Sequence, residues 1–184
     1  MAAPPVSGPL ASLPAAGAQD ACEGMGGAYL RARLRGAASL DVSWHGDSLH
    51  CDGGLRPDGQ GVRVSFNGSV PAHRLLFIFG IDTAPRRGAE HNVATNLTVI
   101  FEGERRLYST GGAGRCSLDE LTTETMPRLH GVRRLQLQAR GFCIAPASAL
   151  GGGAALLVSR FDFRGAFFLD QPETRGPSTG PAPR

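Results

Sequence analysis

The sequence predicts an all-β domain, an antiparallel β-sandwich of about seven or eight strands with one short helix. Apolar and polar residues alternate in many short segments along the chain. Glycine (26 residues) and proline (13) are abundant, and both favour tight turns between short elements. Hydrophobic residues make up 41% of the 184 residues, enough to form the core of one domain. A partly closed barrel is the alternative fold.

The first half of the chain contains a predicted hairpin, a loop and two further strands. Apolar residues alternate with arginines over 28–35 and with other polar residues over 40–44, so these segments are expected to pair as a hairpin. Residues 45–61 are rich in glycine and aspartate and are expected to form a loop. Strands over 62–67 and 75–81 follow. The second is apolar throughout, which predicts a central strand covered on both faces.

The second half of the chain contains four further predicted strands. Residues 97–102 alternate, and 107–109 are expected to pair back with them after a short turn. Residues 134–140 alternate and lead into Cys143, and the last long strand covers 157–164. These segments complete the set of strands expected in the sandwich.

The one predicted helix lies between these strands. Ser117 followed by Glu120 has the spacing of a capping box and opens the segment SLDELTTETM. Pro127 closes it, because proline cannot continue a helix. We expect two to three turns, suited to a short crossover element.

The domain is expected to span residues 22–169, between two segments without core-forming character. Residues 1–21 resemble the end of a signal peptide or a disordered leader, since residues 16–18 (AGA) fit a small-x-small cleavage pattern but no basic region precedes them. Residues 170–184 are rich in proline and lack large apolar residues, which predicts a disordered tail.

The cysteine pattern indicates two disulfides. Cys22, Cys51, Cys116 and Cys143 form an even set without the C-x-x-C spacing of zinc or redox sites. Four cysteines allow three pairings. Pairing Cys22 with Cys51 and Cys116 with Cys143 is preferred, because each bond then joins a loop or terminus to a nearby strand. Disulfides require an oxidising compartment, so we expect a periplasmic or secreted protein.

Charge and motifs exclude several functional classes. The net charge is +3, which is too low for a nucleic-acid-binding domain. All 19 basic residues are arginine, which is typical of a GC-rich genome, and we expect a bacterial source. The sequence contains no apolar run long enough for a transmembrane helix. It also contains no nucleophile elbow, P-loop, dinucleotide fingerprint or H-E-x-x-H motif. No catalytic residue and no cofactor is predicted.

One loop carries several residues of the types that bind metals. His45, Asp47, His50 and Asp52, with Asp58 beyond them, place imidazoles and carboxylates close together in the sequence. Their spacing matches no known metal-binding loop, and such residues are common in solvated turns. A metal site here is therefore the alternative hypothesis, and a solvated turn is the preferred one.

Three segments resemble a pattern found in uncharacterised exported bacterial β-proteins. They are FEGERRLYSTGGAGRCSLDEL (101–121), ARGFCIAP (139–146) and the final strand LLVSRFDFRGAFF. In that pattern an EG-x-x-R-x-x-ST strand pair precedes one cysteine, and a second cysteine lies on the next long strand. The resemblance covers about 62–168 and implies a bond between Cys116 and Cys143. It implies no activity.

The sequence thus favours a non-enzymatic exported domain that binds a partner or belongs to the cell envelope. The partner is expected to be a protein or an envelope component, without nucleic acid. The alternative is a metal-binding or metalloenzyme domain that uses the 45–58 loop. A hydrolase with a non-standard site and a carrier of small ligands are less favoured.

Overall fold

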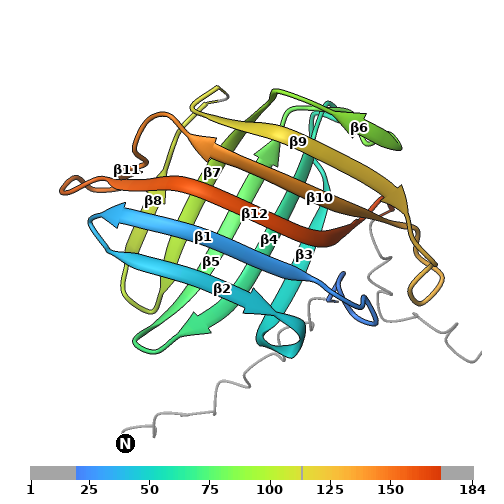
Figure 1. Cartoon of the computed structure of the whole chain (residues 1–184), viewed down its shortest axis with the longest axis horizontal. Helices are drawn as coiled ribbons and strands as arrows, with labels where there is room; N and C mark the ends of the chain where they lie inside the picture. The colour runs from blue at the N-terminus through green and yellow to red at the C-terminus, as the bar shows by residue number, and fades with distance from the viewer. Residues whose placement is uncertain (1–19, 113, 171–184) are drawn as a thin grey trace, which may run out of the picture.

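The computed structural model describes residues 20–112 and 114–170, and these form a single antiparallel sheet of twelve strands (Figure 1). The all-β prediction is confirmed. The prediction of a sandwich with about seven or eight strands is wrong, because the strands are more numerous and all belong to one hydrogen-bonded sheet. The predicted leader (1–21) and tail (170–184) lie almost entirely outside the described residues.

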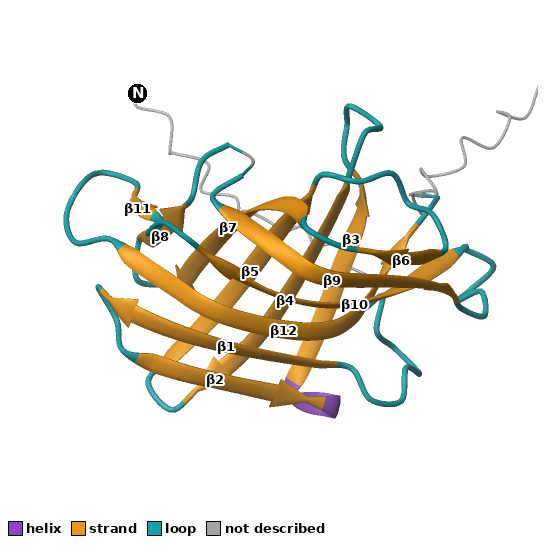
Figure 2. Cartoon of the chain, turned by 45° about the horizontal axis from the view of Figure 1, so that its top comes forward, coloured by secondary structure: helices purple, strands orange, loops and turns teal. Residues whose placement is uncertain are grey.

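The strands cover most of the described chain, joined by short turns (Figure 2). Their bounds are β1 (Tyr29–Gly36), β2 (Leu40–His45), β3 (Leu49–Leu55), β4 (Val62–Val70), β5 (His73–Ile81), β6 (Gly88–Glu90), β7 (Val93–Glu102), β8 (Arg106–Ser109), β9 (Cys116–Thr125), β10 (Arg134–Cys143), β11 (Ser148–Ala149) and β12 (Leu156–Phe168).

The sheet is folded over on itself, so that its two halves face each other. Its main order is β2-β1-β12-β10-β9-β7-β5-β4-β3. In Figure 1 five strands, β2, β1, β12, β10 and β9, form a front layer. The other strands of this order, β7, β5, β4 and β3, run behind them at a steep angle. The layers join where β9 pairs with β7 over only three residue pairs, and β12 packs against β3 on the other side. Such near-orthogonal layers follow from strong twist and local bends in the strands.

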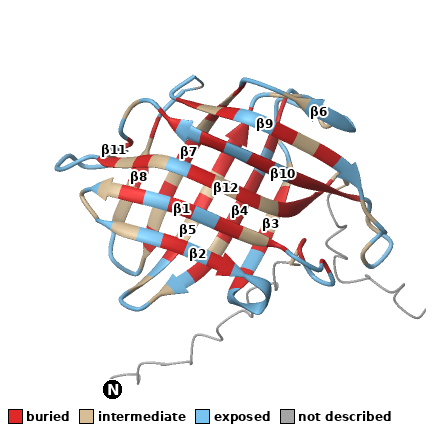
Figure 3. Cartoon of the chain, in the orientation of Figure 1, coloured by how far each residue is buried: buried red, intermediate tan, exposed pale blue. Residues whose placement is uncertain are grey.

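The predicted pairing of the hairpin and of 107–109 is confirmed. β1 pairs with β2, with Arg33 directly opposite Asp41, and β8 pairs with β7. Figure 3 shows the expected banding, with buried and exposed residues alternating along the front strands. Alternation therefore predicted these paired strands and their inward faces correctly.

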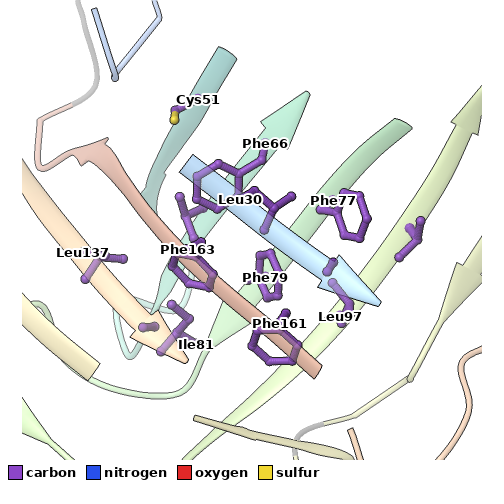
Figure 4. Close-up of a cluster of buried hydrophobic side chains, with 14 of the residues drawn as sticks. Leu30, Cys51, Phe66, Phe77, Phe79, Ile81, Leu97, Leu137, Phe161 and Phe163 are labelled. Carbon is purple, nitrogen blue, oxygen red and sulfur yellow. The ribbon is translucent and has the colours of Figure 1, made fainter. Parts of the chain in front are cut away.

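A cluster of aromatic rings fills the space between the layers (Figure 4). Phe79 on β5 is fully buried, and its ring centroid lies 4.7 Å from that of Phe163 and 5.0 Å from that of Phe161, both on β12. The ring centroid of Phe66 on β4 lies 5.0 Å from that of Phe163. Tilted and edge-on aromatic packing at these separations adds to the free energy gained by burial. These rings hold the two layers together.

Two glycines allow the layers to approach at the points where strands cross. A Cβ atom on Gly165 of β12 would lie 2.5 Å from the ring of Phe66, and one on Gly68 of β4 would lie 2.6 Å from the ring of Trp44. Trp44 is buried as predicted, and its indole N–H donates a 2.8 Å hydrogen bond to the carbonyl of Ser69. Glycine at these positions makes room for large rings from the opposite layer.

Both preferred disulfides are present. Cys22 bonds to Cys51 on β3, and Cys116 on β9 bonds to Cys143 directly opposite on β10. One carboxylate oxygen of Asp20 accepts hydrogen bonds from the backbone N–H groups of Cys22 and Cys51, at 2.9 and 3.0 Å. The first disulfide thus attaches the start of the described chain to the sheet.

A buried arginine holds the same segment from the other side. Arg134 at the start of β10 is 6% exposed, and its guanidinium donates hydrogen bonds to the carbonyls of Ala21, Glu23 and Pro127 at 2.7–3.0 Å. Of these three residues only Ala21 is buried, so its carbonyl in particular would otherwise be left without a donor, at a cost in free energy. Arg134 therefore ties the Cys22 segment to the turn between β9 and β10.

The predicted helix is wrong, because residues 116–125 form strand β9. Leu118 and Leu121 are both buried and three residues apart, a spacing typical of helices. The sheet achieves it with a β-bulge: Leu118 pairs with Gly141 and Glu120 with Arg140, which leaves Asp119 as an extra residue. The only helix in the described chain is a three-residue 3-10 turn at Gly46–Ser48.

Two further expectations are corrected. The 45–61 segment is not all loop, because β3 occupies Leu49–Leu55 and pairs with β4 throughout. β5 is not covered on both faces, since Leu76 and Ile78 are only partly buried on the outer side. Within the described residues, no helix is long and apolar enough to span a membrane.

Candidate binding site

The outer face of the front layer carries a hollow of about 640 Å³. Strand alternation places polar side chains on this face and the apolar ones against the aromatic cluster. The lining side chains come from β1, β9, β10 and β12, and include Tyr29, Asp119, Glu120, Arg140, Arg160 and Asp162. The volume falls in the range of small-ligand sites. The polar lining suits a polar ligand.

A smaller hollow of about 210 Å³ adjoins the first and shares Arg160 and Asp162 with it. Arg31 and Arg33 from β1 and Asp41 from β2 line its other side. The two hollows together run transverse to the strands of the front layer, from β2 across β1, β12 and β10 to β9. The surface can therefore accommodate an extended molecule as well as a compact one.

A β-bulge lies on each of the two strands that flank β10. On β9, Asp119 is the extra residue. On β12, Arg160 pairs with Arg33 and Val158 with Leu34, so that Ser159 is the extra residue beside Arg160. Bulges redirect neighbouring side chains and increase local twist. Both irregularities thus occur at the larger hollow.

Most charged groups of the larger hollow have a partner. A guanidinium nitrogen of Arg140 lies 2.6 Å from a carboxylate oxygen of Glu120. Asp162 lies 3.8 Å from Arg31. Burial raises the pKa of Tyr29, and the nearby Asp162 carboxylate raises it further, so the phenol stays protonated at neutral pH.

Arg160 and Asp119 are the exceptions. Within residues 20–112 and 114–170, neither side chain forms an ion pair or a hydrogen bond, and both residues are exposed at the hollow. Arg160 also lies directly opposite another cation, Arg33, on the neighbouring strand. As far as the described residues show, the hollow therefore offers one unpaired cation and one unpaired anion to a bound molecule.

A second polar cluster joins β5 to the turn between β7 and β8. Nδ1 of His73 lies 2.5 Å from one carboxylate oxygen of Glu104, and Arg106 donates to the other at 3.0 Å. These contacts hold the pKa of Glu104 below its ordinary value, with the hydrogen bond to His73 as the larger cause. Arg106 also stacks over Phe101 at 4.1 Å and donates to the Tyr108 hydroxyl at 3.2 Å. Its donors are thus engaged within the protein.

The structure distributes the four predicted metal-site residues over three elements. His45 ends β2, Asp47 lies in the 3-10 turn, and His50 and Asp52 are on β3. A ring nitrogen of His50 lies 3.0 Å from Asp20, and Asp52 accepts a hydrogen bond from the N–H of Gly53.

Among the described residues, one group of three ligand-type side chains lies close together: Asp20, Cys22 and Cys51. Its two cysteines are bonded to each other, so their sulfur atoms are not free thiolates for a metal. Metal binding by His45, Asp47, His50 and Asp52 stays a prediction.

Sequence reasoning missed the two residues that distinguish the hollow. Asp119 was expected on a helix, and Arg160 was one of many arginines on a solvated strand face. The signal for Asp119 was the pair of adjacent polar residues between Leu118 and Leu121, which in a strand marks a bulge. No comparable signal identifies Arg160, since its lack of a partner depends on the sheet register.

Comparison with known protein families, characterised proteins and solved structures finds no match. The resemblance to exported bacterial β-proteins is therefore not supported by any relative, although the Cys116–Cys143 bond that it implies is present. The fold and the hollow define an all-β, disulfide-bonded domain, and its function must be argued from the site itself.

Proposed function

We propose that this protein is an exported, non-enzymatic binding domain that holds a polar ligand or partner group on the outer face of its front layer. The main support for this proposal is the hollow of about 640 Å³, which is lined largely by polar side chains from four strands of one sheet. Binding sites built on strands hold their groups in more precise positions than sites built on loops, which favours recognition without rearrangement.

Export is part of this proposal and is supported by the two disulfides. Each closes a loop of moderate length, and every cysteine of the chain takes part. Such use of cysteine is typical of periplasmic and secreted proteins, where thiols are oxidised. A cell-envelope component is one form that such a binding domain takes.

NMR titration of the isotope-labelled full chain tests the binding proposal. We would add three probes separately: triglycine, maltotriose as a neutral sugar, and a heparin oligosaccharide as a polyanion. At least one should shift backbone amide signals of 138–141 and 160–162 more than those of β3–β5. The proposal is wrong if no probe does so, or if all shifts map to the back layer.

The rival proposal, a metal-binding domain that uses the 45–58 loop, requires a different measurement. Elemental analysis of untagged protein would reveal a bound metal. We expect none at stoichiometric amounts, and one metal per chain that is lost on substitution of His50 would favour the rival.

A further inference from the structure

We propose that the larger hollow selects a small zwitterionic ligand, with its carboxylate at Arg160 and its ammonium group at Asp119. This inference rests on the proposed binding function and specifies the chemistry of that site. It assigns the two side chains opposite and complementary roles.

Most charged side chains of the larger hollow are already paired within the protein. The other charged groups of the larger hollow are Arg140, Glu120 and Asp162, and each has an oppositely charged neighbour within the protein. Arg160 and Asp119 have none in the described part of the chain. A ligand with a single charge would satisfy one of them only, whereas a zwitterion satisfies both.

The strand register adds a reason for an anion at Arg160. Arg160 lies directly opposite Arg33, and like charges at such positions repel each other. Arg33 has Asp41 beside it, at 3.6 Å, while Arg160 has no such partner among residues 20–112 and 114–170. A ligand carboxylate next to Arg160 would remove this repulsion and form charge-assisted hydrogen bonds with the guanidinium.

Strand spacing sets the expected separation of the ligand's charges. Asp119 is on β9 and Arg160 on β12, with β10 between them, so their backbones are two inter-strand spacings apart. Two such spacings amount to about 10 Å. Three extended residues span about 10 Å as well. The distance between the ammonium and carboxylate groups of triglycine is therefore of the same order as the distance between the backbones that carry Asp119 and Arg160.

The hollow also has room for such a molecule. Its volume of about 640 Å³ exceeds what a single ion needs, and Tyr29 and Gln138 line it with further polar groups. Size and charge thus agree on a short peptide or a molecule with a similar distribution of charge.

The test measures affinities for triglycine and for two blocked forms by NMR titration of the full chain. Triglycinamide lacks the carboxylate, and N-acetyltriglycine lacks the ammonium group. For the native protein, the affinity of each blocked form should be at least about fivefold lower than that of triglycine, as expected for partly exposed charge-assisted contacts.

Two variants assign the effect to the two side chains. Arg160→Gln should make triglycine and triglycinamide bind equally well, while N-acetylation still weakens binding. Asp119→Asn should make triglycine and N-acetyltriglycine bind equally well, while loss of the carboxylate in triglycinamide still weakens binding. Both residues are exposed, so the fold should persist, and the amide spectrum checks this. Arg63→Gln, an exposed arginine on β4, is the matched control and should leave all three affinities unchanged.

The outcomes separate this inference from the function on which it rests. If all three peptides shift the amides of 138–141 and 160–162 with equal affinity, the zwitterion selectivity is refuted and the binding function stands. The same holds if only maltotriose or the heparin oligosaccharide shifts them. If no probe shifts these amides, both proposals fail. Selectivity unchanged in both variants would refute the assignment to Arg160 and Asp119.

Discussion

Replacing Phe79 with alanine should destabilise the domain more than almost any other single substitution. Phe79 is fully buried, and its ring contacts Phe66 and Phe77 in its own layer and Phe161 and Phe163 in the opposite one. Truncating a buried phenylalanine costs about 3–5 kcal/mol. The upper half of that range is expected, because the cavity would open between two layers whose strands are restrained by hydrogen bonds and cannot collapse onto it.

Urea unfolding followed by the fluorescence of the single tryptophan measures this change. Phe79→Leu retains most of the volume and should cost about 1.5 kcal/mol or less. Leu150→Ala, at a residue that is 77% exposed, should change the free energy of unfolding by about 0.5 kcal/mol or less. A loss below about 1.5 kcal/mol for Phe79→Ala would mean that the layers do not pack through this cluster.

Three further predictions concern the bonds that hold the sheet together. Replacing Cys116 and Cys143 by serine opens a loop with a sequence separation of 27 and should cost about 3–4 kcal/mol, measured by urea unfolding against the native protein. Arg134→Met leaves the buried Ala21 carbonyl without its donor and removes two further hydrogen bonds to carbonyls of exposed residues, and should cost about 1–3 kcal/mol in the same assay, whereas an unchanged midpoint would contradict the proposed role. Because the pKa of Glu104 is lowered in the folded state, its contribution to stability is present above its ordinary value of 4.5 and lost as the pH falls below that value. Glu104→Gln should therefore reduce the fall of the thermal unfolding midpoint as the pH drops below about 4.5. An unaltered dependence of this midpoint on pH would refute the contribution of Glu104 to stability.

Strand alternation predicted much of the fold from the sequence. The 28–35 and 40–44 hairpin, the pairing of 107–109 and the inward position of Trp44 are all confirmed. They depend on local pattern and on neighbours in the chain, which a single sequence records. The two disulfides were also found, because each joins strands or segments that are close in sequence.

The failures have a common physical cause, which is that tertiary pairing overrides local pattern. The 117–126 segment has a helix-like spacing of leucines, but pairing with β10 and a bulge at Asp119 make it a strand. Likewise, β3 was hidden in a segment rich in glycine and aspartate, where pairing with β4 stabilises an extended backbone. The sandwich prediction failed because sequence alone does not reveal that the two layers share one continuous sheet.

The candidate site could not be predicted for a related reason. A free charge is defined by the absence of a partner, and partners on a sheet are set by the register of strands far apart in the sequence. Arg160 and Arg33 are opposite only because β12 returns to pair with β1 after more than half the chain has intervened. The sequence showed a polar strand face, and the register shows which charges on it are unpaired.

A crystal structure of the protein with triglycine tests the central claim most directly. The account predicts one peptide in the larger hollow, with its carboxylate within hydrogen-bond distance of the Arg160 guanidinium and its ammonium group at the Asp119 carboxylate. A peptide bound in the reverse orientation, or bound only to the outer face of β3–β5, would contradict it.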